Sequence, residues 1–381
     1  MRIVIVTEYF PSSAKGEITG GVEARAFFVA RELAKRHQVT VVCSRRPGQR
    51  KKDSYLNIKV ERVGPVYEYT PTGHLIKRVI FGFAAISKAR RLCRANFDVI
   101  DGYSYLCYPA AILASKKTRR FLTYHEVWLD SWKKNTLRFA GILGELAERI
   151  VLWLTKITGI RVISVSGFTK GRLEEHGILP DKISVVANGV NLERFKLKVG
   201  KKFKHPTICY VGRLVEHKRV DDLINAFVIV RRKVKDLKLI IVGDGSAKTK
   251  LELLVKKLGL SEHIEITGYF KSYDEVVIAL KKSHVFCSPS VVEGFGITVV
   301  EAAASGVPFV ISDIEPFREV SKGGKGGLLF RQRDIADLAK KLEMLLKDKK
   351  LYERCKKEGK KLASEYGWQE IAKKIEEVYT Q

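Results

Sequence analysis

The chain has 381 residues, enough for two or three domains that each bury a hydrophobic core. Hydrophobic residues make up 45% and charged residues 29%, a composition that excludes an intrinsically disordered chain. The formal net charge of +28 favours an anionic partner, whether nucleic acid, an anionic membrane surface or an anionic substrate.

The six cysteines are scattered and include no Cys-x-x-Cys pair, which argues against a zinc site and against a disulfide framework. We therefore expect a reducing, cytoplasmic location. The apolar run Ile3–Val6 is too short for the core of a signal peptide, and no uncharged run approaches the length of a membrane span.

Apolar β-branched runs alternate with helical patterns along the chain, which predicts an α/β protein with parallel sheets and crossover helices. The predicted strands of the first half are Arg2–Thr7, Gln38–Cys43, Ile58–Val63, Val99–Gly102, Phe121–His125, Val162–Val165 and Ile183–Val186. Those of the second half are Thr207–Val211, Leu239–Val242, Ile264–Thr267, Val285–Cys287, Pro308–Ile311 and Gly327–Phe330.

The first strand leads through a polar loop to Gly20-Gly21 and a helix over Ala24–Lys35. Glycines at a helix start allow a ligand to approach the backbone closely, although a plain turn explains them equally well. Their spacing is not Gly-x-Gly-x-x-Gly, which disfavours a dinucleotide-binding dehydrogenase.

His74–Asn96 carries six basic residues and no acid: Lys77, Arg78, Lys88, Arg90, Arg91 and Arg94. The apolar residues Leu75, Ile76, Val79, Ile80 and Phe83 share one face, and we expect Lys77, Arg78 and Lys88 on another flank. This pattern is typical of a helix at a membrane surface, and the alternative is an ordinary domain helix with a basic solvated side.

His125 stands at the carboxyl end of a predicted parallel strand, where side chains point toward bound ligands. The alternative is a histidine that caps the next helix or bonds to nearby backbone. Glu126 and Asp130 follow as carboxylates that are candidates for contact with an acceptor.

The strand Thr207–Val211 is followed by Gly212-Arg213-Leu214, with Lys218 five residues after the arginine. On one strand-to-helix loop, both cations can reach the same diphosphate. Gly243-Asp244-Gly245 and Gly268 follow the next two strands and are expected to be turns.

Glu293 and Glu301 lie eight residues apart across the sequence Gly294-Phe295-Gly296-Ile297-Thr298, and a helix is predicted to start just after Gly296. The N–H groups at such a helix start suit a phosphate. A carboxylate two turns inside the helix can then hold the hydroxyls of a ribose, whereas Glu293 lies just before the helix begins. Solvated surface glutamates are the alternative.

The two motifs together, Gly-Arg-Leu…Lys and Glu-x7-Glu, resemble the nucleotide-sugar glycosyltransferases, most closely the retaining enzymes of family 4. The resemblance implies the architecture known as GT-B, with two Rossmann-like parallel-sheet domains facing a cleft and a C-terminal helix that crosses back. We expect an acceptor-side domain over residues 1–190, a donor domain over 191–366 and the returning helix over 367–381. Trp368 is expected to pack where this helix crosses, and a helix that stays on its own domain is the alternative.

The resemblance implies transfer of a hexosyl group from a nucleoside-diphosphate sugar, with retention and without a metal or other cofactor. It assigns the donor phosphates to Gly20, Gly21, Arg213, Lys218 and the helix start from Gly294 to Thr298. It also assigns the donor sugar to Glu293 and His125, and the ribose to Glu301. The loop from Asp313 to Glu319 departs from the family pattern, which leaves the base and the sugar undetermined.

Two rival functions fit parts of this pattern. A nucleotide-sugar epimerase uses the same architecture, and a basic scaffold for nucleic acid or membrane would explain the charge. Nucleic acid is disfavoured because the chain lacks a recognition motif and an aromatic platform. We therefore expect a lipid-linked or glycan acceptor and an enzyme in the cytoplasm, peripheral on the inner face of the cell membrane.

Overall fold

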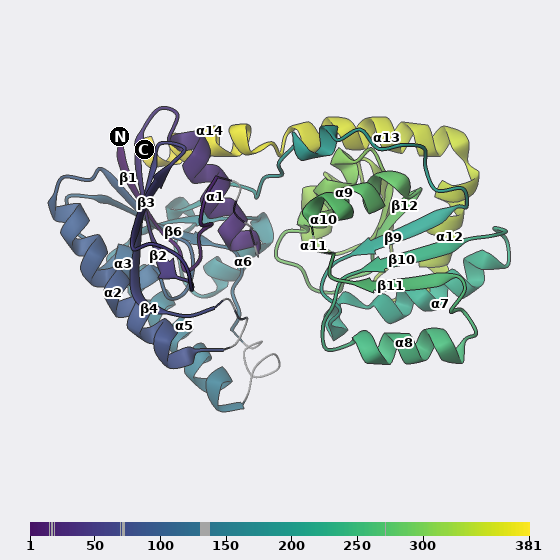
Figure 1. Ribbon diagram of the computed structural model, residues 1–381, viewed down its shortest axis with the longest axis horizontal. Helices are drawn as coiled ribbons and strands as arrows, with labels where there is room; N and C mark the ends of the chain where they lie inside the picture. The colour runs from purple at the N-terminus through teal and green to yellow at the C-terminus, as the bar shows by residue number, and fades with distance from the viewer. Residues whose placement is uncertain are drawn as a thin grey trace. The chain divides into compact units, whose positions relative to one another are not determined.

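The computed structural model describes residues 1–14, 16, 18, 20–68, 70, 73–129, 138–270 and 272–381 (Figure 1). The chain forms two compact units. Unit 1 contains Met1–Asn188 together with Trp368–Gln381, and unit 2 contains Gly189–Gly367.

Unit 1 is built on an eight-stranded sheet in the order β3-β4-β2-β1-β5-β6-β7-β8. Neighbouring strands are parallel except for the antiparallel pair β3 and β4. The strands are β1 (Arg2–Val6), β2 (Gln38–Arg45), β3 (Lys52–Tyr55), β4 (Ile58–Val66), β5 (Val99–Gly102), β6 (Arg119–Tyr124), β7 (Arg161–Ser164) and β8 (Ile183–Val185). Strand β3 was not predicted.

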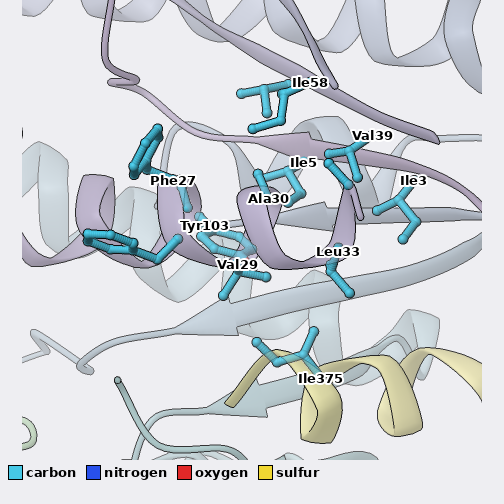
Figure 2. Close-up of a cluster of buried hydrophobic side chains, with 14 of the residues drawn as sticks. Ile3, Ile5, Phe27, Val29, Ala30, Leu33, Val39, Ile58, Tyr103 and Ile375 are labelled. Atoms are coloured by element: carbon cyan, nitrogen blue, oxygen red, sulfur yellow. The ribbon is translucent and has the colours of Figure 1, made fainter. Parts of the chain in front are cut away.

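Helices cover both faces of this sheet because successive strand residues point to opposite sides. They are α1 (Gly21–Leu33), α2 (Leu75–Arg94), α3 (Tyr108–Ile112), α5 (Arg138–Thr158), α6 (Gly167–Glu175) and α14 (Trp368–Thr380). One core joins Ile3 and Ile5 of β1 to α1 and α14 (Figure 2). The second core joins Val4 and Val6 to α2, α3 and α5.

The C-terminal helix α14 packs against α1 within unit 1. Trp368 stacks on Phe28 with ring centroids 5.3 Å apart and an interplanar angle of 13°. At the other end of α14, the hydroxyl of Tyr379 donates to Oδ2 of Asp101 at 2.7 Å. The last helix therefore completes the core of unit 1, which begins some 370 residues earlier in the chain.

Unit 2 holds a six-stranded sheet in the order β11-β10-β9-β12-β13-β14, parallel throughout. The strands are β9 (Thr207–Val211), β10 (Lys238–Val242), β11 (Ile264–Gly268), β12 (Val285–Ser288), β13 (Phe309–Ser312) and β14 (Gly327–Phe330). The helices are α7 (Val220–Arg231), α8 (Lys248–Lys257), α9 (Tyr273–Lys282), α10 (Ile297–Ala304), α11 (Glu315–Val320), α12 (Ile335–Lys347) and α13 (Lys349–Ser364). The prediction of two Rossmann-like parallel-sheet domains is confirmed.

The basic helix α2 differs from its prediction on one flank. The five residues of the predicted apolar face are all exposed, as is Lys77: Leu75, Ile76, Val79, Ile80 and Phe83. Lys88, however, is buried and forms an ion pair with Glu61, and Arg78 lies 2.6 Å from Oε1 of Glu8. Arg78 and Lys88 therefore do not form the basic flank expected beside the apolar face, because Glu8, just after β1, and Glu61 of β4 pair with them.

Candidate functional site

The topology of unit 2 singles out one edge of its sheet. The chain builds outward from β9 through β10 to β11, then crosses to β12 and continues through β13 to β14. In open α/β sheets, ligands bind at the carboxyl ends of the strands where the order reverses. The two loops at this point, after β9 and after β12, are the two loops that carry the sequence motifs.

The loop after β9 is held by close backbone packing. A Cβ on Gly243 would lie 1.9 Å from the carbonyl oxygen of Gly212, and a Cβ on Gly245 would lie 2.4 Å from that of Leu214. The Leu214 N–H also donates to the Asp244 carbonyl at 2.8 Å. This close backbone packing therefore requires glycine at both positions, as expected for the turns predicted from the sequence.

Lys218 and Glu293 meet at this edge of the sheet. Nζ of Lys218 lies 2.6 Å from Oε1 of Glu293, and the two side chains are 12% and 16% exposed. The hydroxyl of Ser290 donates to the same carboxylate oxygen at 2.9 Å. Arg213 is exposed on the same loop as Lys218, and the hydroxyl of Tyr210 donates to its carbonyl at 3.0 Å. A cation and a carboxylate from the two motifs thus form one polar cluster.

Helix α10 begins at Ile297, immediately beside this cluster in the chain. Its N-cap, Gly296, has φ of 91°, and no side chain caps the helix. A Cβ at Gly296 would lie 2.7 Å from Cε1 of Phe317, which lies on α11 in the segment that departs from the family pattern. Because the first N–H groups of a helix have no intrahelical partner, those at Ile297 and Thr298 can donate to an anion. Phe295 is buried and packs on Tyr366, and Gly294 is half-buried.

Glu301 lies one helical turn into α10, not the two turns expected from the sequence, because the helix begins only at Ile297; the side chain is buried. The hydroxyl of Tyr273 donates to Oε1 of Glu301, and the guanidinium of Arg194 lies 5.1 Å from the centroid of the Tyr273 ring. Burial raises the pKa of Glu301 to about 7, although the Tyr273 hydrogen bond lowers it. A carboxyl group that titrates near neutrality suits hydrogen bonding to a polar ligand.

Three predicted site residues belong to unit 1. Gly20 is the extended N-cap of α1, and a Cβ on Gly21 would meet nothing within 4 Å, so the chain leaves space beside Gly21. His125 follows β6 and is half-buried, with its ring centroid 6.4 Å from that of Tyr103. Burial and the charge of Arg25 lower the pKa of His125 to about 3, which keeps the imidazole neutral.

Arg25 was not predicted and is fully buried. Its guanidinium donates to the carbonyl oxygens of Val186 at 3.0 Å and Ala187 at 2.8 Å, and to Oδ1 of Asn188 at 3.0 Å. A buried cation costs free energy unless hydrogen bonds satisfy it, and these acceptors take hydrogen bonds from both terminal nitrogens, whereas the buried Nε has no partner among the described residues. These hydrogen bonds also attach the end of the segment Met1–Asn188 to α1.

Tyr273 was also missed from sequence. Tyr273 and Ser290 contact Glu301 and Glu293 through side-chain hydroxyls, and neither stands in a motif of its own. Glu126 is exposed, and its carbonyl accepts from the hydroxyl of Tyr105 at 2.8 Å. Asp130 lies outside the described residues.

In the part of the chain that the structure describes, no group of three or more His, Cys, Asp and Glu side chains is placed to hold a metal ion. Within the same ranges, no helix combines the length and apolar character needed to cross a bilayer.

Comparison with known proteins assigns this arrangement to a family. The model described as Glycosyltransferase Family 4 matches residues 19–194, and the model described as Glycosyl transferases group 1 matches residues 192–362. An uncharacterized glycosyltransferase of Methanocaldococcus jannaschii is 32% identical over 219 residues, which are 58% of this chain and 59% of that protein. The phosphatidyl-myo-inositol mannosyltransferase of Mycobacterium leprae is 29% identical over 397 residues, which are 100% of this chain and 96% of that protein.

Among solved structures, sucrose-phosphate synthase from Thermosynechococcus elongatus has the same fold, with a TM-score of 0.79 at 17% identity and coverage of 100% of this chain and 98% of that one. The two family models adjoin and together span residues 19–362, so the match includes both units. The chain belongs to family 4 of the glycosyltransferases, enzymes of the GT-B fold that transfer a sugar from a nucleotide-sugar donor.

Proposed function

We propose that this enzyme transfers a hexosyl group from a nucleoside-diphosphate sugar to a membrane-borne acceptor, either lipid-linked or part of a glycan. Transfer proceeds with retention at the anomeric carbon and without a metal ion. The observation that carries the proposal is the cluster at the switch point of unit 2, where Lys218, Glu293 and the start of α10 come together.

The leaving group of this reaction is a nucleoside diphosphate, on which negative charge develops as the glycosidic bond breaks. Lys218 and Arg213 supply two positive charges, and the N–H groups at Ile297 and Thr298 supply donors at the positive end of a helix dipole. Such a pre-arranged set of donors stabilises an anion in the transition state, a task that a divalent metal performs in other transferases.

The Lys218–Glu293 ion pair gives both residues a defined position before the donor binds. When the diphosphate arrives, Lys218 exchanges its carboxylate partner for a phosphate. Glu293 is then released to accept hydrogen bonds from hydroxyls of the donor sugar. Glu301 holds the ribose hydroxyls, and the neutral His125 of unit 1 contacts the sugar, as the family resemblance implies. Gly20 and Gly21 leave room for donor phosphates beside α1.

The acceptor is inferred from the M. leprae relative, whose name specifies phosphatidyl-myo-inositol and which aligns with the whole chain. A lipid acceptor places the reaction at a membrane. The exposed basic residues and apolar face of α2 suit the anionic inner surface of the cell membrane.

A panel of nucleoside-diphosphate sugars tests the proposal. We expect thermal stabilisation by one or a few of them, followed by transfer of labelled sugar to an extracted lipid fraction, with the α-configured donor giving an α-linked product by NMR. Transfer should continue in a chelator. Release of nucleotide with an altered free sugar and no acceptor product would identify an epimerase instead. Strict dependence on an added divalent cation would contradict the metal-free mechanism.

A further inference from the structure

Helix α5 has two apolar sides, and only one of them is covered. Val151 and Leu152 are buried in the second core of unit 1. The opposite side carries the α5 stripe, defined as Ile142, Leu143, Leu146, Ile150, Trp153 and Ile157, whose exposed fractions run from 42% to 59%. With 3.6 residues per turn, these six side chains lie within about 100° of arc. A surface helix of a globular protein ordinarily carries polar residues on the side opposite the core, so this second apolar side calls for an explanation.

Helix α2 presents a similar surface. The α2 patch, defined as Leu75, Ile76, Val79, Ile80 and Phe83, includes the most exposed large apolar side chains among the described residues of unit 1, with Ile76 at 77% and Phe83 at 70%. Both α2 and α5 pack against α3 and contribute to the same core, so they cover the same face of the sheet (Figure 1). Their outer sides therefore face away from the sheet in the same general direction.

The exposed charges described on these two helices are all basic: Lys77, Arg90, Arg91, Arg94, Arg149 and Lys156. Helix α5 also contains two glutamates, but Glu148 is buried and Glu145 pairs with Arg149 at 2.9 Å. Two exposed apolar surfaces on helices that cover the same face of the sheet, bordered by one sign of charge, indicate a specific kind of partner. Two copies of such a face would repel each other, whereas an anionic bilayer offers both negative head groups and an apolar layer.

We propose that the α5 stripe and the α2 patch together form one face that docks on an anionic lipid bilayer, with α5 lying flat in the interface. The 21 residues of α5 span about 30 Å, so its stripe can enter the boundary between head groups and acyl chains along its whole length. Trp153 lies where an amphipathic ring is favoured, at the level of the head groups. This inference rests on the proposed function, because a lipid-borne acceptor requires the enzyme at that surface.

The experiment compares full-length variants for binding to vesicles of phosphatidylcholine with and without phosphatidylglycerol, at low and high salt. Wild-type protein should bind the vesicles that contain phosphatidylglycerol, and salt should weaken that binding. The double variant Ile150→Ser/Trp153→Ser should lower the partition coefficient at least about tenfold, as should Ile76→Ser/Phe83→Ser. Leu253→Ser is the matched control, because Leu253 is 63% exposed on α8 of unit 2 and should leave binding unchanged.

Trp153 also allows a direct measurement. Its fluorescence should shift to shorter wavelength on vesicles and be quenched by brominated lipid, and Trp153→Phe should remove that signal. Wild-type binding retained in the α5 double variant would overturn the proposal. So would a wild-type dimer that the α5 variant dissociates in the absence of vesicle binding, which would identify a second copy as the partner. Thermal shift with the panel of nucleoside-diphosphate sugars, run on the same samples, separates the two hypotheses. Donor stabilisation without vesicle binding refutes only the docking face, whereas vesicle binding without donor stabilisation refutes the proposed function.

Discussion

Replacing Glu301 by glutamine should make unit 2 more stable at pH 8 and leave its stability nearly unchanged at pH 4. Burial raises the pKa of Glu301 from 4.5 to about 7 in the folded protein. As the pH rises through this window, the unfolded chain loses the proton first, so the native state loses stability. Glutamine never ionises and still accepts the hydrogen bond from Tyr273.

The expected size follows from the pKa difference. One pKa unit corresponds to about 1.4 kcal/mol, so a rise from 4.5 to about 7 amounts to about 3 kcal/mol. Most of this difference should develop between about pH 5 and 7. Unit 2 runs from Gly189 to Gly367, and in a domain of that size 1 kcal/mol shifts the thermal midpoint by about 2–4 °C. The variant should therefore unfold about 6–12 °C above wild type at pH 8.

Thermal unfolding of both proteins from pH 4 to pH 8 measures this difference. Burial also raises the pKa of Asp101 to about 7 and lowers that of His125 to about 3, but both groups are present in wild type and variant and cancel in the comparison. Glu252→Gln, at an exposed position on α8, serves as the control, and its thermal midpoint should differ from that of wild type by the same amount at every pH. A difference in thermal midpoint between Glu301→Gln and wild type that stays the same from pH 4 to pH 8 would refute the reasoning.

Three further predictions concern the switch-point cluster. Lys218→Ala and Arg213→Ala should each lower transfer by about a hundredfold with the fold intact, because each removes a cation from the developing diphosphate. The control variant Lys233→Ala, which disrupts a surface ion pair with Glu343, should leave the rate of transfer unchanged. Glu293→Gln should lower kcat while calorimetry shows nucleotide diphosphate bound nearly as well, and equal loss of nucleotide in Glu293→Gln and Glu301→Gln would contradict the separate roles. Gly296→Ala should cost about 2–4 kcal/mol of stability in urea unfolding, because φ is 91° and Phe317 occupies the Cβ position, and Phe317→Leu should recover part of it.

Most strands could be predicted from sequence because buried parallel strands are continuous apolar runs. The strands β5, β9 and β14 have the predicted bounds, and the others agree within one to three residues. Strand β3 was missed because Lys52–Tyr55 is polar and its partner β4 follows a turn at Leu56 and Asn57. Both turn residues have positive φ, at 52° and 61°, and no glycine marks them.

The candidate site was likewise predictable only in part from the sequence. Family motifs identified Arg213, Lys218, Glu293 and Glu301 as candidates, and the parallel topology brings their loops to one edge of the sheet. No local pattern indicated that Lys218 and Glu293, far apart in the chain, would form an ion pair, or that Tyr273 would donate to Glu301. Those contacts depend on the order of strands, which periodicity does not report.

The sequence by itself determined the class of fold, the alternation of strands and helices and the family. These depend on local patterns and on motifs at fixed spacing. Only the tertiary structure decided which side chains are covered. Lys88 faces inward because β4 places Glu61 beside it, and the α5 stripe stays exposed because the core accepts only the opposite side of that helix. The physical reason is that an amphipathic pattern shows which sides of a helix are apolar, whereas burial depends on what long-range packing brings against each side.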